Sequence, residues 1–202
     1  MIGLIVSFVV WAIFHSITAA QGFKDWVARF TGERVYQGFY RLFYSAVSVI
    51  TLLPVLYFYW QLPDRPLYSV PAPFSWLMIG LQVAGFIGLT VSVLQSGALS
   101  FVGIQQAADY FSGNDIGKQS GLGEVLVIHG LYHYMRHPLY AFSMLLLWAS
   151  PAMSRNSLIL VLLISTYFVL GSFIEERRLE QDFGEAYADY RKQVSRFIPF
   201  VW

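Results

Sequence analysis

Cysteine is absent from the 202 residues of this chain, and charged residues make up only 12% of them. The lack of cysteine excludes disulfide bridges, cysteine metal ligands and a catalytic thiol supplied by the protein itself. Soluble domains carry about a quarter charged residues, so the low charge argues against a soluble protein. The net charge is only +1 and no glycine-rich phosphate-binding motif occurs, so neither nucleic acid nor a dinucleotide is indicated as a partner.

Hydrophobic residues account for 56% of the chain and gather in long runs. Several runs approach the ~20 residues that a helix needs to cross a bilayer. We therefore predict an all-α membrane protein with five spans in a single domain (1–202). No basic segment precedes the first run, so we expect a retained span rather than a cleaved signal peptide. The predicted spans cover residues 2–20, 42–60, 74–94, 138–153 and 158–174.

Basic residues are distributed unequally between the segments that separate these spans. With five spans, eleven lysine and arginine residues fall on one side, and only Arg65 and Arg155 fall on the other. Because basic residues favour the cytoplasmic side, we expect the N-terminus outside and the C-terminus in the cytoplasm.

Two further segments have helical patterns without being spans. Residues 21–41 are aromatic and basic, which is typical of an interfacial helix. In residues 175–202, apolar side chains recur at a helical spacing, which predicts an amphipathic helix against the cytoplasmic face.

The sequence GLYHYMRHPLY (130–140) concentrates polar side chains directly before the fourth span. Pro138 suits the first turn of a helix and keeps His137 out of helical geometry. The free amides of a helix start, together with Arg136, suit a negatively charged group. A simple topology anchor is the alternative explanation for this motif.

Glu175 and Glu176 close the fifth span. If the last two spans form a hairpin, both glutamates lie at the same depth as Arg136 and His137. Ionisable groups at a membrane edge are candidates for function, although a solvated helix end is the ordinary alternative.

Two segments in the last 80 or so residues are EVLVIHGLYHYMRHPLY (124–140) and EERRLEQDFGEAYADYRKQVSRFIPF (175–200). Together they resemble the isoprenylcysteine carboxyl methyltransferase superfamily of integral membrane methyltransferases. Elsewhere in the chain, FHSITAAQGFKDW, FVGIQQ and LLLWASPAMS resemble the methanethiol S-methyltransferase and NnrU-like branch of that superfamily. The matching residues are Leu126, Val127, Gly130, Tyr132, Arg136, His137, Pro138, Tyr140, Glu175, Glu176, Phe183, Gly184, Tyr187, Tyr190, Val194 and Pro199.

The resemblance implies that S-adenosylmethionine binds at the cytoplasmic ends of the last two spans, within residues 121–202. Arg136, His137 and Glu176 are the implied catalytic residues, while His137 or a glutamate would accept a proton. The implied cofactor-binding residues are Glu124, Leu126, Val127, Gly130, Tyr132, His137, Pro138, Leu139, Tyr140, Glu175 and Glu176. Which of the two glutamates holds the cofactor is left open.

Three other residues are candidates for the acceptor site. His15 lies inside the first span, and Gln105 lies in FVGIQQ. Packing for His15 and helix capping for Gln105 are the alternatives. Phe142 stands where the family commonly has glycine, and Glu124 stands where it often has histidine. His129, His133 and His137 recur every four residues, but Pro138 interrupts that helix and no metal site is predicted.

The predicted function is methyl transfer from S-adenosylmethionine to a small thiol or another compact apolar acceptor. Such an acceptor would enter from the bilayer, and the expected location is a bacterial inner membrane. A lipid or isoprenoid carboxylate or amine is the alternative acceptor. A non-catalytic membrane assembly factor of the NnrU type is the alternative from another class. The sequence does not indicate an oligomeric state.

Overall fold

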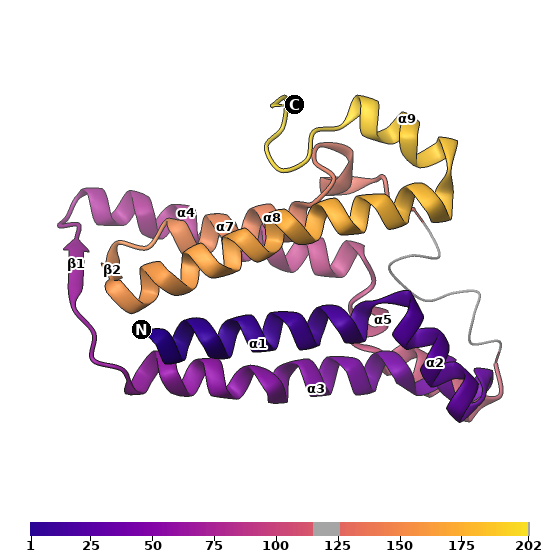
Figure 1. The fold of residues 1–202 in the computed structure, drawn as a ribbon. Helices are drawn as coiled ribbons and strands as arrows, with labels where there is room; N and C mark the ends of the chain where they lie inside the picture. Colours follow the sequence, from indigo (N-terminus) through magenta and orange to yellow (C-terminus); the bar gives the residue numbers. More distant parts are fainter. Residues whose placement is uncertain (115–125, 202) are drawn as a thin grey trace. The chain divides into compact units, whose positions relative to one another are not determined.

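The computed structural model describes residues 1–114 and 126–201, and helices dominate these ranges (Figure 1). The all-α prediction is confirmed, since four of the described helices are long and apolar enough to cross a membrane. Contacts divide the chain into two compact units, Met1–Leu62 with Ser96–Val125 and Pro63–Gln95 with Leu126–Trp202.

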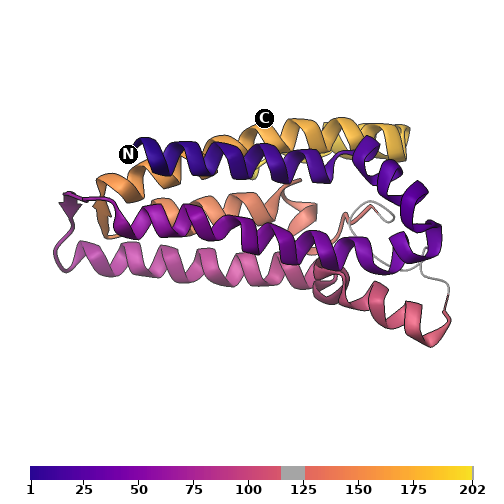
Figure 2. The same cartoon turned by 60° about the horizontal axis from the view of Figure 1, so that its bottom comes forward.

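In the first unit, two long apolar helices pack side by side, as both views show (Figures 1 and 2). Leu4 and Phe8 of one helix and Val55 of the other are buried in this unit. The elements are α1 (Ile2–Ala19), α2 (Gln21–Thr31), α3 (Glu33–Gln61), α5 (Ala98–Val102) and α6 (Ile104–Ser112).

The predicted interfacial helix over 21–41 is wrong in its length. The helix α2 ends at Thr31, and Gly32 follows with φ of 84°. Because that backbone region strongly favours glycine, the helix stops there and α3 starts at Glu33. Residues 33–41 therefore extend the second span instead of lying in the interfacial helix.

The second unit is a helical bundle with a small sheet at one end and the RHP motif (residues 136–138) at the other. Its strands pair antiparallel, with Pro66 opposite Ser154 and Ser69 opposite Ala152. The elements are β1 (Pro66–Ser69), α4 (Phe74–Gln95), the 3-10 turn η1 (Gly130–His133), α7 (Pro138–Trp148), β2 (Ala152–Ser154), α8 (Arg155–Phe183) and α9 (Glu185–Gln193).

The helices α4 and α7 approach closely because glycines lie between them. A Cβ atom on Gly85 would be 2.9 Å from the backbone nitrogen of Leu146, and one on Gly88 would be 2.3 Å from the Phe142 ring. The Phe142 side chain, a candidate for the acceptor site, thus packs against the backbone of α4. Small residues permit this kind of close helix contact in membranes.

The fourth predicted span, 138–153, is helical only as far as Trp148. Eleven helical residues rise about 17 Å, too little to cross the ~30 Å hydrocarbon core alone. Extended chain and β2 complete the distance to the start of α8. Backbone groups of this non-helical segment are paired, since β2 pairs with β1 and the Val70 N–H donates to the Pro151 carbonyl. Such pairing is what a non-helical segment at membrane depth requires.

The predicted continuous amphipathic helix over 175–202 is also wrong. The last span continues as α8 to Phe183, Gly184 ends it, and α9 then runs to Gln193. Val194 is extended, and the chain then returns to the RHP motif, where Ser195 forms a parallel bridge with Met135.

Candidate functional site

The RHP motif is held by its own backbone against the C-terminal segment. The Arg136 N–H donates to the Ser195 carbonyl at 2.8 Å, and the His137 N–H donates to the Arg196 carbonyl at 3.0 Å. Pro138 begins α7, as predicted, and His137 precedes the helix with φ of −124° and ψ of 61°. The two segments are about 60 residues apart in the sequence, so this pairing determines where Arg136 and Arg196 lie.

Glu176 is the centre of the ionic cluster that results, and it is only 2% exposed. Its Oε1 accepts from Arg136 Nε at 2.9 Å and from Arg196 Nε at 3.1 Å, while Arg196 Nη2 lies 2.7 Å from Oε2. His137 Nε2 is 3.2 Å from Oε1, and Arg191 Nε is 3.9 Å from Oε2. The chain's own cations therefore surround both oxygens of this carboxylate.

These partners change the acidity of Glu176, which lies beyond Ile174, the last residue of the apolar part of α8. Burial by itself raises the pKa of the carboxyl group. Hydrogen bonds from His137, Arg196 and Arg136 outweigh burial and lower the pKa from 4.5 to about 2. Glu176 is therefore ionised at any physiological pH.

Glu175 has a more open environment, with a side chain that is 30% exposed. Its Oε2 accepts from the Tyr140 hydroxyl at 2.9 Å and lies 3.6 Å from His137 Nδ1. The ring of Tyr140 stacks between His137, at 5.4 Å and 2°, and Phe168, at 4.8 Å and 8°. Three parallel rings thus fix the Tyr140 hydroxyl against a carboxylate that solvent reaches.

The turn η1 places Tyr132 beside this cluster. Gly130 opens the turn with φ of 62°, and a Cβ atom there would lie 2.1 Å from the Gln95 side chain. Gln95 in turn accepts from the Leu131 N–H at 2.9 Å. The Tyr190 hydroxyl of α9 donates to the Tyr132 carbonyl. The backbone angle thus favours glycine at position 130, and a Cβ atom there would displace the Gln95 side chain that binds Leu131.

The structure brings most of the predicted site residues together in the second unit. Leu126 and Val127 lie in the irregular chain that leads to η1, and Leu139 lies in the first turn of α7. Glu124 lies outside the described residues.

The two acceptor candidates His15 and Gln105 belong to the first unit. His15 Nε2 is 2.6 Å from the Tyr44 hydroxyl, and its Nδ1 is 2.9 Å from Ser48 Oγ. Gln105 donates to the Asp109 carboxylate of the next helical turn. Each candidate is thus hydrogen-bonded within its own unit.

Arg191 and Arg196 were missed as site residues by sequence reasoning. Both were counted only as cytoplasmic charges, since a helix continued through residue 202 would have carried Arg196 away from Glu176. Gly184 was the sequence signal that could have predicted the end of the helix, because glycine commonly terminates a helix at its C-terminus.

A cluster of this kind at the end of an apolar helical bundle is typical of a membrane protein with an ionic site at its surface. This chain belongs to the NnrU protein family, whose model matches residues 3–201.

Several curated relatives of the chain are named methyltransferases. It is 30% identical to methanethiol S-methyltransferase 2 of Bradyrhizobium diazoefficiens over 188 residues, which is 93% of this chain and 69% of that protein. Identity to methanethiol S-methyltransferase of Mycobacterium tuberculosis is 29% over 198 residues, or 95% of this chain and 75% of that protein. A protein-S-isoprenylcysteine O-methyltransferase of Tribolium castaneum is 28% identical over 155 residues, covering 67% of this chain and 53% of that protein.

No solved structure is a significant match. The resemblance described from the motifs is confirmed by the family and by these relatives, and so is the predicted class of membrane methyltransferase.

Proposed function

We propose that this protein transfers the methyl group of S-adenosylmethionine to a small apolar thiol. The names of the relatives support a thiol acceptor. The observation that carries the proposal is the placement of Glu175, an accessible carboxylate, beside the stacked rings of His137, Tyr140 and Phe168.

The residues present fit the cofactor, which carries an ammonium, a sulfonium and an adenine ring. Glu175 Oε1 has no hydrogen-bond partner among the described residues, and its position suits an ammonium group. Aromatic surroundings suit the sulfonium and the adenine. Glu176 is enclosed by Arg136 and Arg196, so in this proposal it positions those side chains and Glu175 binds the cofactor.

When bound, the cofactor would supply a methyl group carried on a positively charged sulfur. After the transfer, the rest of the cofactor is a neutral thioether. In the proposed transfer, the acceptor sulfur would form a bond to the methyl carbon as the sulfonium–carbon bond breaks, and the thiol proton would pass to solvent. A free thiol has a pKa of about 8.5, so nearby cations help it to ionise. Arg136 supplies positive charge at this end of the bundle.

The proposed location is a bacterial inner membrane with the site at the cytoplasmic face. In the second unit, the end that carries the RHP motif holds the arginine cluster, while the end with the strands holds Arg65 and Arg155. The positive-inside tendency therefore favours a cytoplasmic site. An apolar thiol would reach it from the bilayer, and the charged cofactor would reach it from water.

Calorimetric titration of the detergent-purified protein with S-adenosylmethionine tests the cofactor site. Glu175→Gln is expected to weaken binding about 10- to 100-fold, because one charge-assisted hydrogen bond is lost. Glu180→Gln is the matched control, since it removes a carboxylate from the same helix that binds Arg191 instead. Unchanged binding by Glu175→Gln would contradict the role of Glu175.

Acceptor choice requires turnover, measured as methyl thioether formed from methanethiol and S-adenosylmethionine. An isoprenylcysteine carboxylate is the comparison acceptor, chosen because the Tribolium relative is named for it. Faster methylation of the carboxylate would contradict the thiol proposal. Folded protein that binds no cofactor would contradict the enzyme proposal itself and favour a membrane assembly factor.

A further inference from the structure

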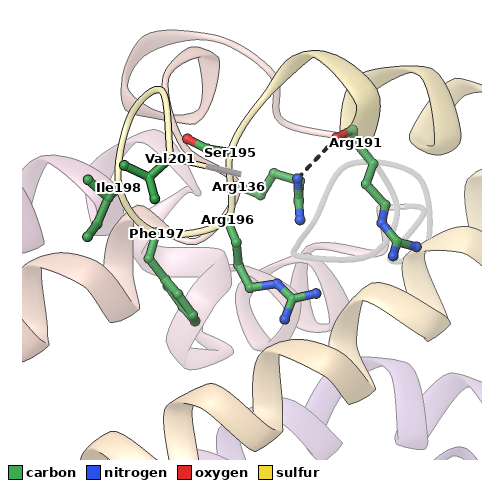
Figure 3. Close-up of a pocket in the computed structure, with 7 residues that line it drawn as sticks. All are labelled: Arg136, Arg191, Ser195, Arg196, Phe197, Ile198 and Val201. Atoms are coloured by element: carbon green, nitrogen blue, oxygen red, sulfur yellow. Dashed lines mark hydrogen bonds between the residues drawn. The ribbon is translucent and has the colours of Figure 1, made fainter.

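A hollow of about 550 Å³ opens beside the C-terminal segment of the second unit (Figure 3). Its walls include the side chains of Arg136, Arg191, Arg196, Phe197, Ile198 and Val201. Of the predicted site residues only Arg136 lines it, while His137, Tyr140 and Glu175 do not. The hollow therefore lies beside the proposed cofactor site and shares only Arg136 with the predicted site residues.

The polar wall retains unused hydrogen-bond donors. Arg136 is fully engaged, because it binds Glu176 and also donates to the carbonyls of Arg191 and Val194. Arg196 binds Glu176 through Nε and Nη2, which leaves Nη1 with no partner among the described residues. Arg191 binds Glu180 through Nη1, and its side chain is 45% exposed. Its Nη2 also has no hydrogen-bond partner among the described residues and can donate to a ligand.

Charge in this wall is not balanced. Three guanidinium groups face two carboxylates, those of Glu176 and Glu180, so one positive charge is left over. Arginine binds phosphate and carboxylate oxygens through paired N–H groups, so the wall suits an anion.

The opposite wall is apolar and is located where a span ends. In Figure 3, Phe197, Ile198 and Val201 gather on one side of the hollow and the arginine side chains on the other. Ile198 and Val201 are exposed. The guanidinium of Arg196 lies 3.7 Å from the ring centre of Phe173, in the last apolar turn of α8. The hollow is thus at the depth of the lipid headgroups.

We propose that this hollow binds the phosphate headgroup of an anionic phospholipid. Arg191 and Arg196 hold the phosphate, and an acyl chain lies against Ile198 and Val201. A soluble anion would use the arginines but gain nothing from an exposed apolar wall, whereas a lipid uses both. The binding does not depend on the proposed methyl transfer.

The test is lipid binding by native mass spectrometry of the full chain in detergent, without S-adenosylmethionine. Short-chain phosphatidylglycerol is expected to bind more tightly than phosphatidylcholine of the same chain length. Arg191→Gln should weaken phosphatidylglycerol binding about fivefold, the usual effect of one basic residue at an anionic surface. Lys192→Gln, the matched control, removes the same charge from the next residue, which is 74% exposed and pairs with Asp189, and should change nothing.

A second variant separates the lipid from a free anion. Ile198→Ser should weaken phosphatidylglycerol binding and leave binding of inorganic phosphate, measured by calorimetry, unchanged. Equal losses in Arg191→Gln and Lys192→Gln would indicate general surface attraction and overturn the proposal. Inorganic phosphate that displaces the lipid at equal concentration, or displacement by S-adenosylmethionine, would overturn it as well.

Discussion

Glu176 connects three segments that are far apart in the chain: the RHP motif, α8 and the C-terminal segment. Its carboxylate binds Arg136, Arg196 and His137 at distances of 2.7 to 3.2 Å. A buried pair of this kind is costly to break from one side, because the partner cations stay buried without compensation. The enclosed residue thus determines the shape of the site, and its neighbour Glu175 faces solvent.

Glu176→Gln is expected to lower the free energy of unfolding by about 3 kcal/mol at neutral pH, the lower end of the cost of breaking a buried ion pair. The pKa of Glu176 is lowered to about 2 from 4.5, so its stabilisation is complete above pH 4.5 and is lost as the pH falls towards 2. The difference between wild type and variant should therefore shrink over that range. Thermal unfolding in detergent as a function of pH measures this difference.

Glu180→Gln is the control for that experiment, because its carboxylate is exposed and its partner Arg191 is exposed too. Surface pairs contribute little, so a change within about 0.5 kcal/mol is expected at every pH. A wild-type profile that does not depend on pH between 4.5 and 2 would contradict the ionic role of Glu176.

At the scale of elements, the contact between α4 and α7 positions the start of α7, where the RHP motif ends. Gly85 and Gly88 lie against Leu146 and Phe142. Phe142, which stands where the family commonly has glycine, is one of the predicted candidates for the acceptor site. The structure shows its ring filling the space above Gly88, so a packing role accounts for this side chain in the second unit.

Gly85→Ala is expected to destabilise the protein by about 1–3 kcal/mol, since the added methyl group would press on the α7 backbone rather than on a flexible side chain. Gly80→Ala is the matched control on the same helix, where a Cβ atom meets nothing within 4 Å. Thermal unfolding in detergent compares the two variants. Equal stability would mean that α4 and α7 separate easily.

At the scale of the whole molecule, the proposed topology depends on counting α7 as a membrane segment, although it has only 11 residues. The chain from Pro138 to Ser154 connects the end with the RHP motif to the end with the strands, and α8 returns from there. The helix α7 and the extended segment that follows it thus together take the place of one full-length membrane-spanning helix.

The absence of cysteine makes this topology directly testable. A single cysteine at Ser69, exposed in β1, is expected to react with a membrane-impermeant maleimide in intact cells. One at Lys192 in α9 should react only after the inner membrane is opened, because the C-terminal end is cytoplasmic in the proposal. The reverse labelling pattern would place the site outside the cell.

By itself the sequence determined the all-α class, the presence of membrane-spanning helices, the start of α7 at Pro138 and the nearness of Glu175 and Glu176 to the RHP motif. These features depend on local composition and on one short hairpin. Only the tertiary structure decided which glutamate is enclosed, because adjacent residues on a helix point about 100° apart and either direction is compatible with the sequence. The break at Gly184 and the return of residues 194–196 to Met135 made that choice. The return depends on contacts across some 60 residues, which no local pattern specifies.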